Sequence, residues 1–257
     1  MHISLAAERI FTVFGMPITN TLLMSWIAMA ILILISVFSS RKLRLIPKGL
    51  QNFLESIIEL ILDFIAQITG DRKQAEKFFP LVTTIFIFVL LSNWLGLVPG
   101  VGTIGFFEVA HAEEGGRLFV PFFRSTNSDL NMTLALAIIS VIATQIFGII
   151  TIGFFKHFSR YISFKNPGLT FAGILEGIAE VVKILSFSFR LFGNIFAGEV
   201  LGMVMLSLFP FIAPLPFMFL GVLTAIVQAF VFATLTLVFI TLASEIEEDE
   251  LVEQASI

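Results

Sequence analysis

The sequence predicts an all-α integral membrane protein with about five membrane-embedded helices and one amphipathic surface helix. Of its 257 residues, 57% are hydrophobic and only 13% are charged, whereas about a quarter of a soluble domain is charged. Five apolar stretches are long enough to cross a bilayer. None of them shows the two-residue alternation that is typical of a membrane β-barrel.

Residues 1–20 are expected to form the exterior N-terminal segment of a single membrane domain that covers residues 1–257. This segment has no basic region before its first apolar run and no small-residue cleavage site, so it does not predict a signal peptide. Cysteine is absent, which excludes disulfides and thiolate metal sites.

The apolar stretches are predicted to be helices, because backbone polar groups find no water in hydrocarbon and must bond within the segment. About 20 helical residues cross a hydrocarbon core of about 30 Å. The stretches that reach this length are 21–39, 78–98, 131–155, 170–205 and 217–243.

A further helix is expected at 49–69. Glu55, Glu59, Asp63 and Gln67 recur every four residues and form one polar stripe on an otherwise apolar helix. Three carboxylates in mid-span would be costly in lipid, which favours a helix lying along the membrane surface. A sixth span whose polar stripe is hidden in a bundle is the alternative.

Basic residues predict the orientation. Most of them flank the surface helix or fall between the third and fourth spans, which is a positive-inside bias. The N-terminus is therefore expected outside and the acidic tail, 244–257, in the cytoplasm. The cytoplasmic set is Arg41, Lys42, Arg44, Lys48, Arg72, Lys73, Lys77, Lys156, Arg160 and Lys165, and the exterior set is Arg9, Arg117 and Arg124.

The longest exterior loop, 100–128, leads to Asp129, which is well placed as the N-cap of the third span. One histidine with scattered carboxylates falls in this loop and does not predict a metal site. These residues are Glu108, His111, Glu113 and Glu114.

The fourth span carries more charge than a helix needs for packing alone. At 3.6 residues per turn, six of its side chains step by three or four positions and form one seam. The stretch 170–205 would measure about 50 Å, more than a straight crossing needs, so the helix should tilt or curve. The seam consists of Glu176, Glu180, Lys183, Phe187, Arg190 and Asn194.

Arg190 decides how this seam is interpreted. A guanidinium stays charged in proteins, and holding it in mid-membrane costs at least about 2.5–3.5 kcal/mol. Lys183 lies near the cytoplasmic end, but Arg190 lies deeper and needs water or an acid. An ion pair with Glu199 or Glu180 within this chain is the structural alternative. Glu199 points about half a turn away and Glu180 lies about 15 Å back along the axis, so an acid on another polypeptide fits better.

The last span has one strongly hydrogen-bonding side chain near its middle, Gln228. A lone buried glutamine is often only an interhelical contact. On the pattern alone, both that interpretation and a functional one stay open.

The fourth span resembles a known family. The segment SFSFRLFGNIFAGEVL, 186–201, is similar to the signature of subunit a of F-type ATP synthases, with Arg, Asn and Glu at fixed spacing in an apolar helix. The resemblance covers most of the chain from about residue 45 to 245. It is also carried by the segments 79–100, 128–137, 174–183 and 227–245.

The resemblance implies two offset half-channels against a rotating ring of c subunits, with the last two helices strongly tilted along that ring as an ion-path hairpin, 170–243. It implies that Arg190 is the obligatory stator arginine, that Glu199 lines the half-channel open to the outside, and that Gln228 faces Arg190. Other polar positions on the cytoplasmic route, near the arginine or near the external funnel would be Glu176, Ser186 and Asn194, and further Asp129, Asn131, Lys183 and Glu180.

One position departs from some relatives. Seven residues before the glutamine, several members carry a histidine or glutamate that partners the outer glutamate, and this chain has Gly221. Glu199 is therefore expected to lack that partner, and either to relay ions alone or to adjoin a space filled by water.

The resulting hypothesis is a stator ion-channel subunit that passes protons to and from c-ring carboxylates and is not catalytic by itself. Its expected partners are the c ring, b-type peripheral stalk subunits, the lipid bilayer and, indirectly, the F1 sector. We expect no cofactor and no nucleic acid. The expected location is a bacterial plasma membrane, as a multi-pass protein.

Other functions fit the sequence less well. A secondary transporter that binds an anionic solute at Arg190 is the alternative, but the chain shows no repeated halves or broken helices. A membrane scaffold would leave the charged fourth span unexplained. An intramembrane enzyme would need a nucleophile and a base, which the spans do not offer together.

Overall fold

The computed structural model describes residues 7–13, 15–41, 49–109, 117–161, 167–208 and 214–244. Five helices in these ranges are long and apolar enough to cross a membrane, so the predicted all-α membrane fold is confirmed. They are α1 (Asn20–Ser40), α3 (Arg72–Leu97), α4 (Leu130–Ile152), α6 (Pro167–Leu208) and α7 (Pro214–Ser244). The other described elements are β1 (Arg9–Val13), β2 (Met16–Thr19), α2 (Leu50–Thr69), β3 (Gly105–Val109), β4 (Arg117–Pro121), η1 (Thr126–Ser128) and α5 (Phe154–Tyr161).

Several sequence predictions concern residues outside these ranges. They include the first six residues, most of the acidic tail and three of the four candidate metal ligands of the exterior loop, since Glu108 lies on β3. Those positions are 1–6, 42–48, 110–116, 162–166 and 245–257.

Two short antiparallel hairpins were not predicted. β1 pairs with β2 before the first span, and β3 pairs with β4 within the exterior loop. Phe107 and Phe119 face each other across the second hairpin, with ring centroids 5.4 Å apart. Strands of four or five residues carry too few side chains for an alternating pattern to stand out, so their pairing becomes evident only in the fold.

The observed spans begin or end one to six residues from their predicted limits, and two of these differences have a clear local reason. α3 begins at Arg72, before the apolar stretch, because the Asp71 side chain accepts a hydrogen bond from the Lys73 backbone N–H at 3.0 Å. α4 ends at Ile152 because Gly153 adopts a φ of 94°, which side-chain-bearing residues rarely adopt.

The helix expected at 49–69 is confirmed as α2. Its polar stripe is exposed and connects to the start of α3: Arg72 binds Glu59 at 2.8 Å and also binds Asp63. Ile65, near the C-terminal end of α2, is fully buried against α3 and α7. Only the last turns of α2 are therefore fixed in the core of this chain.

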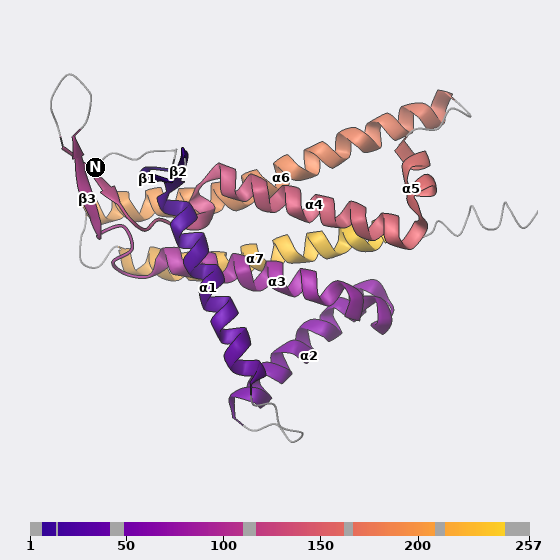
Figure 1. Ribbon diagram of the computed structural model, residues 1–257, viewed down its shortest axis with the longest axis horizontal. Helices are drawn as coiled ribbons and strands as arrows, with labels where there is room; N and C mark the ends of the chain where they lie inside the picture. The colour runs from indigo at the N-terminus through magenta and orange to yellow at the C-terminus, as the bar shows by residue number, and fades with distance from the viewer. Residues whose placement is uncertain are drawn as a thin grey trace, which may run out of the picture.

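α3, α4, α6 and α7 form the bundle, with α7 in contact with the other three (Figure 1). One buried cluster, which includes Val82 and Leu237, joins α2, α3 and α7. A second, which includes Val89, Leu191 and Phe232, joins α3, α4, α6 and α7. α1 crosses the bundle at a steep angle, and the N-terminal half of α6 diverges from it where α5 links α4 to α6 (Figure 1).

α6 is the longest helix and the least covered. Its 42 residues measure about 63 Å at about 1.5 Å per residue, so it cannot cross a bilayer upright. Only 6% of its most apolar stretch is buried in this chain, against 22–44% in the other four spans. The helix that carries the charged seam thus presents most of its surface outward.

Candidate functional site

The charged seam of α6 is divided between two surroundings. Phe187 is buried against α7, with its ring centroid 4.9 Å from that of Phe232. Lys183 Nζ lies 2.6 Å from Glu180 Oε1 and 4.4 Å from the ring centre of Phe239 on α7. These side chains are therefore packed toward α7, and Lys183 already has an acid partner on its own helix.

Arg190 has different surroundings. Its side chain is exposed, and its Nη2 donates a long hydrogen bond of 3.4 Å to Ser186 Oγ, one turn earlier on α6. In the described part of the chain, no carboxylate forms an ion pair with it. The two acids proposed as internal partners are both engaged elsewhere, Glu180 with Lys183 and Glu199 with another arginine.

Glu199 binds Arg124. Arg124 Nε lies 3.2 Å from Glu199 Oε1, and Nη2 lies 3.4 Å from Oε2. Gly221 offers Glu199 no partner, and the pairing with Arg124, from the exterior segment, was not predicted. At Gly221 a Cβ would stand only 3.0 Å from Cδ2 of Leu97, so a leucine side chain adjoins this position.

Sequence reasoning missed Arg124 as a site residue and counted it only as an exterior positive charge. The pair joins residues 75 positions apart. No local periodicity reports such a contact, since it depends on how the exterior segment folds back onto α6.

A short buried segment, 124–129, holds Arg124 in place, and we call it the anchor segment. Asn127 Nδ2 donates to Asn93 Oδ1 on α3 at 2.7 Å, and Thr21 Oγ1 on α1 donates to Asp129 Oδ2 at 3.0 Å. Asp129 also caps α4, as predicted, by accepting from the Asn131 backbone N–H at 3.0 Å. The anchor segment is thus fixed by three helices.

The remaining predicted positions are spread over the bundle. Glu176 and Asn194 are half-buried on α6, and Asn131 is exposed at the start of α4. Gln228 is buried on α7, and its Nε2 has no hydrogen-bond partner among the described residues. Within those residues no hydrogen bond joins Gln228 to Arg190.

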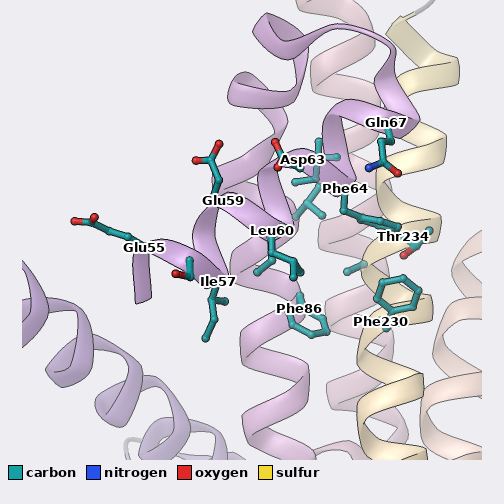
Figure 2. A pocket seen from close by; sticks show the side chains of 15 residues that line it. Glu55, Ile57, Glu59, Leu60, Asp63, Phe64, Gln67, Phe86, Phe230 and Thr234 are labelled. Carbon is teal, nitrogen blue, oxygen red and sulfur yellow. The ribbon is translucent and has the colours of Figure 1, made fainter. Parts of the chain in front are cut away.

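A cavity of about 950 Å³ lies away from these residues, between α2, α3 and α7. Figure 2 shows carboxylates of α2 such as Glu55 and Glu59 near one side, and Phe86 and Phe230 deeper in the wall. Neither Arg190 nor Glu199 lines it. Among the described residues, no group of three metal-binding side chains comes together.

Comparison with known proteins identifies the family. The family model described as ATP synthase A chain matches residues 22–241, from the first span to the end of the last one. The chain belongs to this family. Among ATP synthase A chains, it is 37% identical to "ATP synthase subunit a 1" of Pelobacter propionicus, over 84% of this chain and 83% of the relative.

Other relatives of the ATP synthase A chain family show similar coverage. "ATP synthase subunit a" of Gloeobacter violaceus is 36% identical over 90% of this chain and 85% of its own length. The protein of the same name from Moorella thermoacetica is 34% identical over 90% of this chain and 94% of its own. Together with the five spans, this family membership establishes a multi-pass integral membrane protein.

Proposed function

We propose that this chain is the stationary ion-conducting subunit of a rotary F-type ATP synthase, in which Arg190 separates two half-channels that serve a ring of c subunits. The family supports the coarser statement directly: the chain is a non-catalytic subunit of the membrane sector of an ATP synthase. The proposal adds three details to this statement: two offset ion paths, protons as the ion, and the c ring as the partner.

The observation that carries the proposal is the state of Arg190. A permanent cation stands exposed on the least covered span, and no carboxylate of the described chain neutralises it. An unpaired guanidinium in hydrocarbon is unfavourable, so an acid or water from outside this chain must meet it. Gly193, Gly198 and Gly202 leave the surface of α6 open beside it, since nothing lies within 4 Å of where their Cβ atoms would be.

The mechanism follows from that charge. A ring carboxylic acid that reaches Arg190 is driven to release its proton, because a nearby cation favours the ionised form. The same fixed charge repels a proton that would pass directly between the half-channels. Each ion that crosses 100 mV releases about 2.3 kcal/mol, and several such steps would accumulate as torque on the ring.

The other residues take roles by position. Glu199 lies toward the exterior end of α6 and feeds the outer half-channel, with Asp129 and Asn131 near its funnel. Glu176, Glu180, Lys183, Ser186 and Asn194 belong to the cytoplasmic route or to the surroundings of Arg190, and Gln228 stands beside it on α7. The N-terminus lies outside and the C-terminus in the cytoplasm of a bacterial plasma membrane, and b-type stalk subunits and, indirectly, the F1 sector complete the assembly.

Substitution of Arg190 by lysine tests the proposal. We expect Arg190→Lys to reduce ATP-driven proton pumping in membrane vesicles by more than about tenfold, because a desolvated lysine can lose its proton and arginine cannot. ATP hydrolysis by the purified complex reports whether assembly is preserved. Arg9→Lys, at an exposed arginine on β1, is the matched control and should pump normally. Normal pumping by Arg190→Lys would contradict the proposal.

A further inference from the structure

We infer that Arg124 is a positioning residue of the outer half-channel, which holds the Glu199 carboxylate in place and supplies the countercharge that this chain lacks at position 221. This inference rests on the proposed function, since it takes Glu199 to line that path. Two observations carry it: the geometry of the Arg124–Glu199 pair and the rigidity of the anchor segment.

The pair has the form of a guanidinium fork on a carboxylate. Nε contacts both oxygens, at 3.2 and 3.4 Å, and Nη2 contacts Oε2 at 3.4 Å. Such contacts fix the orientation of a carboxylate as well as its charge. Salt screens this interaction only weakly, because both partners are largely withdrawn from solvent.

The two partners are unequally covered. The Arg124 side chain is 8% exposed, and that of Glu199 is 24% exposed. The carboxylate therefore keeps an open side while the guanidinium stands behind it. Because arginine does not release a proton, Arg124 cannot itself relay one. It can only hold Glu199 and set how strongly an arriving ion competes for the carboxylate.

The anchor segment makes this arrangement rigid. Ser125, next to Arg124, packs so closely on α3 that a Cβ on Gly96 would stand 2.5 Å from the Ser125 Cβ. Asn127 and Asp129 bind α3 and α1 through buried side chains. The guanidinium is thus presented by a segment that three helices hold, and the position of Glu199 relative to α3 and α4 is set through it.

Position 221 on α7 supplies no countercharge to Glu199. Gly221 has no side chain, and Leu97 of α3 occupies the neighbouring space. The countercharge that the structure gives to Glu199 comes from the anchor segment.

The test compares variants in the complete ATP synthase complex reconstituted into liposomes. Passive proton conduction is measured after removal of the F1 sector. We expect Arg124→Gln to lower conduction by about tenfold or more, because it leaves the Glu199 charge without its partner. Arg124→Lys should restore conduction to within about threefold of the unaltered chain, because the adjacent Glu199 carboxylate keeps a lysine there charged, whereas Arg190 has no such acid beside it in the described part of the chain. Arg9→Gln, the exposed exterior control, should stay within about twofold.

Subunit copurification separates assembly from conduction. If Arg124→Gln blocks assembly, the inference requires that Arg124→Lys restore both assembly and conduction. Restored assembly without conduction, or conduction by Arg124→Gln within about twofold of the unaltered chain, overturns the inference. If the inference about Arg124 is overturned but Arg190→Lys still fails to pump protons, the proposed function stands. Normal pumping by Arg190→Lys would contradict the proposed function itself.

Discussion

The charged side chains of α6 have different partners. Lys183 pairs with Glu180 on its own helix, and Glu199 pairs with Arg124 from the anchor segment. Arg190 is exposed and donates a long hydrogen bond to Ser186. Among the described residues, Glu180 and Glu199 are already paired, and no carboxylate forms an ion pair with Arg190. That distribution favours contact between Arg190 and a carboxylate of another polypeptide.

At Asp129 the structure predicts that two substitutions will reduce stability by different amounts. Its carboxylate caps α4 and accepts a hydrogen bond from Thr21 of α1. Asp129→Ala removes both contacts and should destabilise the protein by about 1–2 kcal/mol, whereas Asp129→Asn keeps a good N-cap and should cost much less. Thermal unfolding of the purified complex in detergent would measure the difference. Equal stability of the alanine and asparagine variants would contradict the capping role.

At the scale of elements, the junction between α3 and the anchor segment decides where Arg124 stands. The last turn of α3 carries Gly96 against Ser125, and the end of α3 places Leu97 beside Gly221 on α7. The C-terminal end of α3 therefore supports the segment that carries Arg124, and it also fills the space beside Gly221. The position of the Arg124–Glu199 pair therefore depends on the close approach of these elements.

Gly96→Ala tests this junction. The added methyl group would stand 2.5 Å from the Ser125 Cβ and 3.0 Å from its Cα, so the anchor segment must shift. We expect a loss of about 1–3 kcal/mol in stability and a drop in proton conduction. Gly168→Ala is the control, because nothing lies within 4 Å of its Cβ position on α6. If the two variants melt at the same temperature, the junction is not as tight as described.

At the scale of the whole molecule, the surface of α6 that this chain leaves uncovered favours contact with another protein along the helix. The other spans bury more of their apolar stretches within this chain. Exposed apolar residues along α6 would face lipid or another helix, and the exposed Arg190 among them disfavours lipid. A ring of helices bearing carboxylates satisfies both the apolar and the charged part of this surface.

Cross-linking can identify the covered face, because the sequence has no native cysteine. Phe189 on α6 and Leu34 on α1 are matched positions, 54% and 55% exposed in this chain. We expect Phe189→Cys to form a disulfide with a cysteine placed near the ring carboxylate of a c subunit, and Leu34→Cys to form none. Equal yields at the two positions would argue against α6 as the ring-facing helix.

Much of this protein was evident in the sequence. Hydropathy and span length predicted five crossing helices, a four-residue polar spacing predicted α2, and Asp129 was recognised as a cap. The charge in the fourth span singled out Arg190, and the signature that holds Arg190 and Glu199 pointed to the correct family. These features are local, because helix periodicity and transfer from water to lipid act on residues close together in the chain.

The tertiary structure decided which charges meet. The seam of α6 predicted one face, but packing on α7 turned Lys183 and Phe187 inward and left Arg190 outward. The pairing of Arg124 with Glu199 spans 75 positions, and the filling of the Gly221 space by Leu97 links α3 to α7. No periodicity encodes such contacts, since they arise only when separate elements are brought together, and the same holds for the two short hairpins.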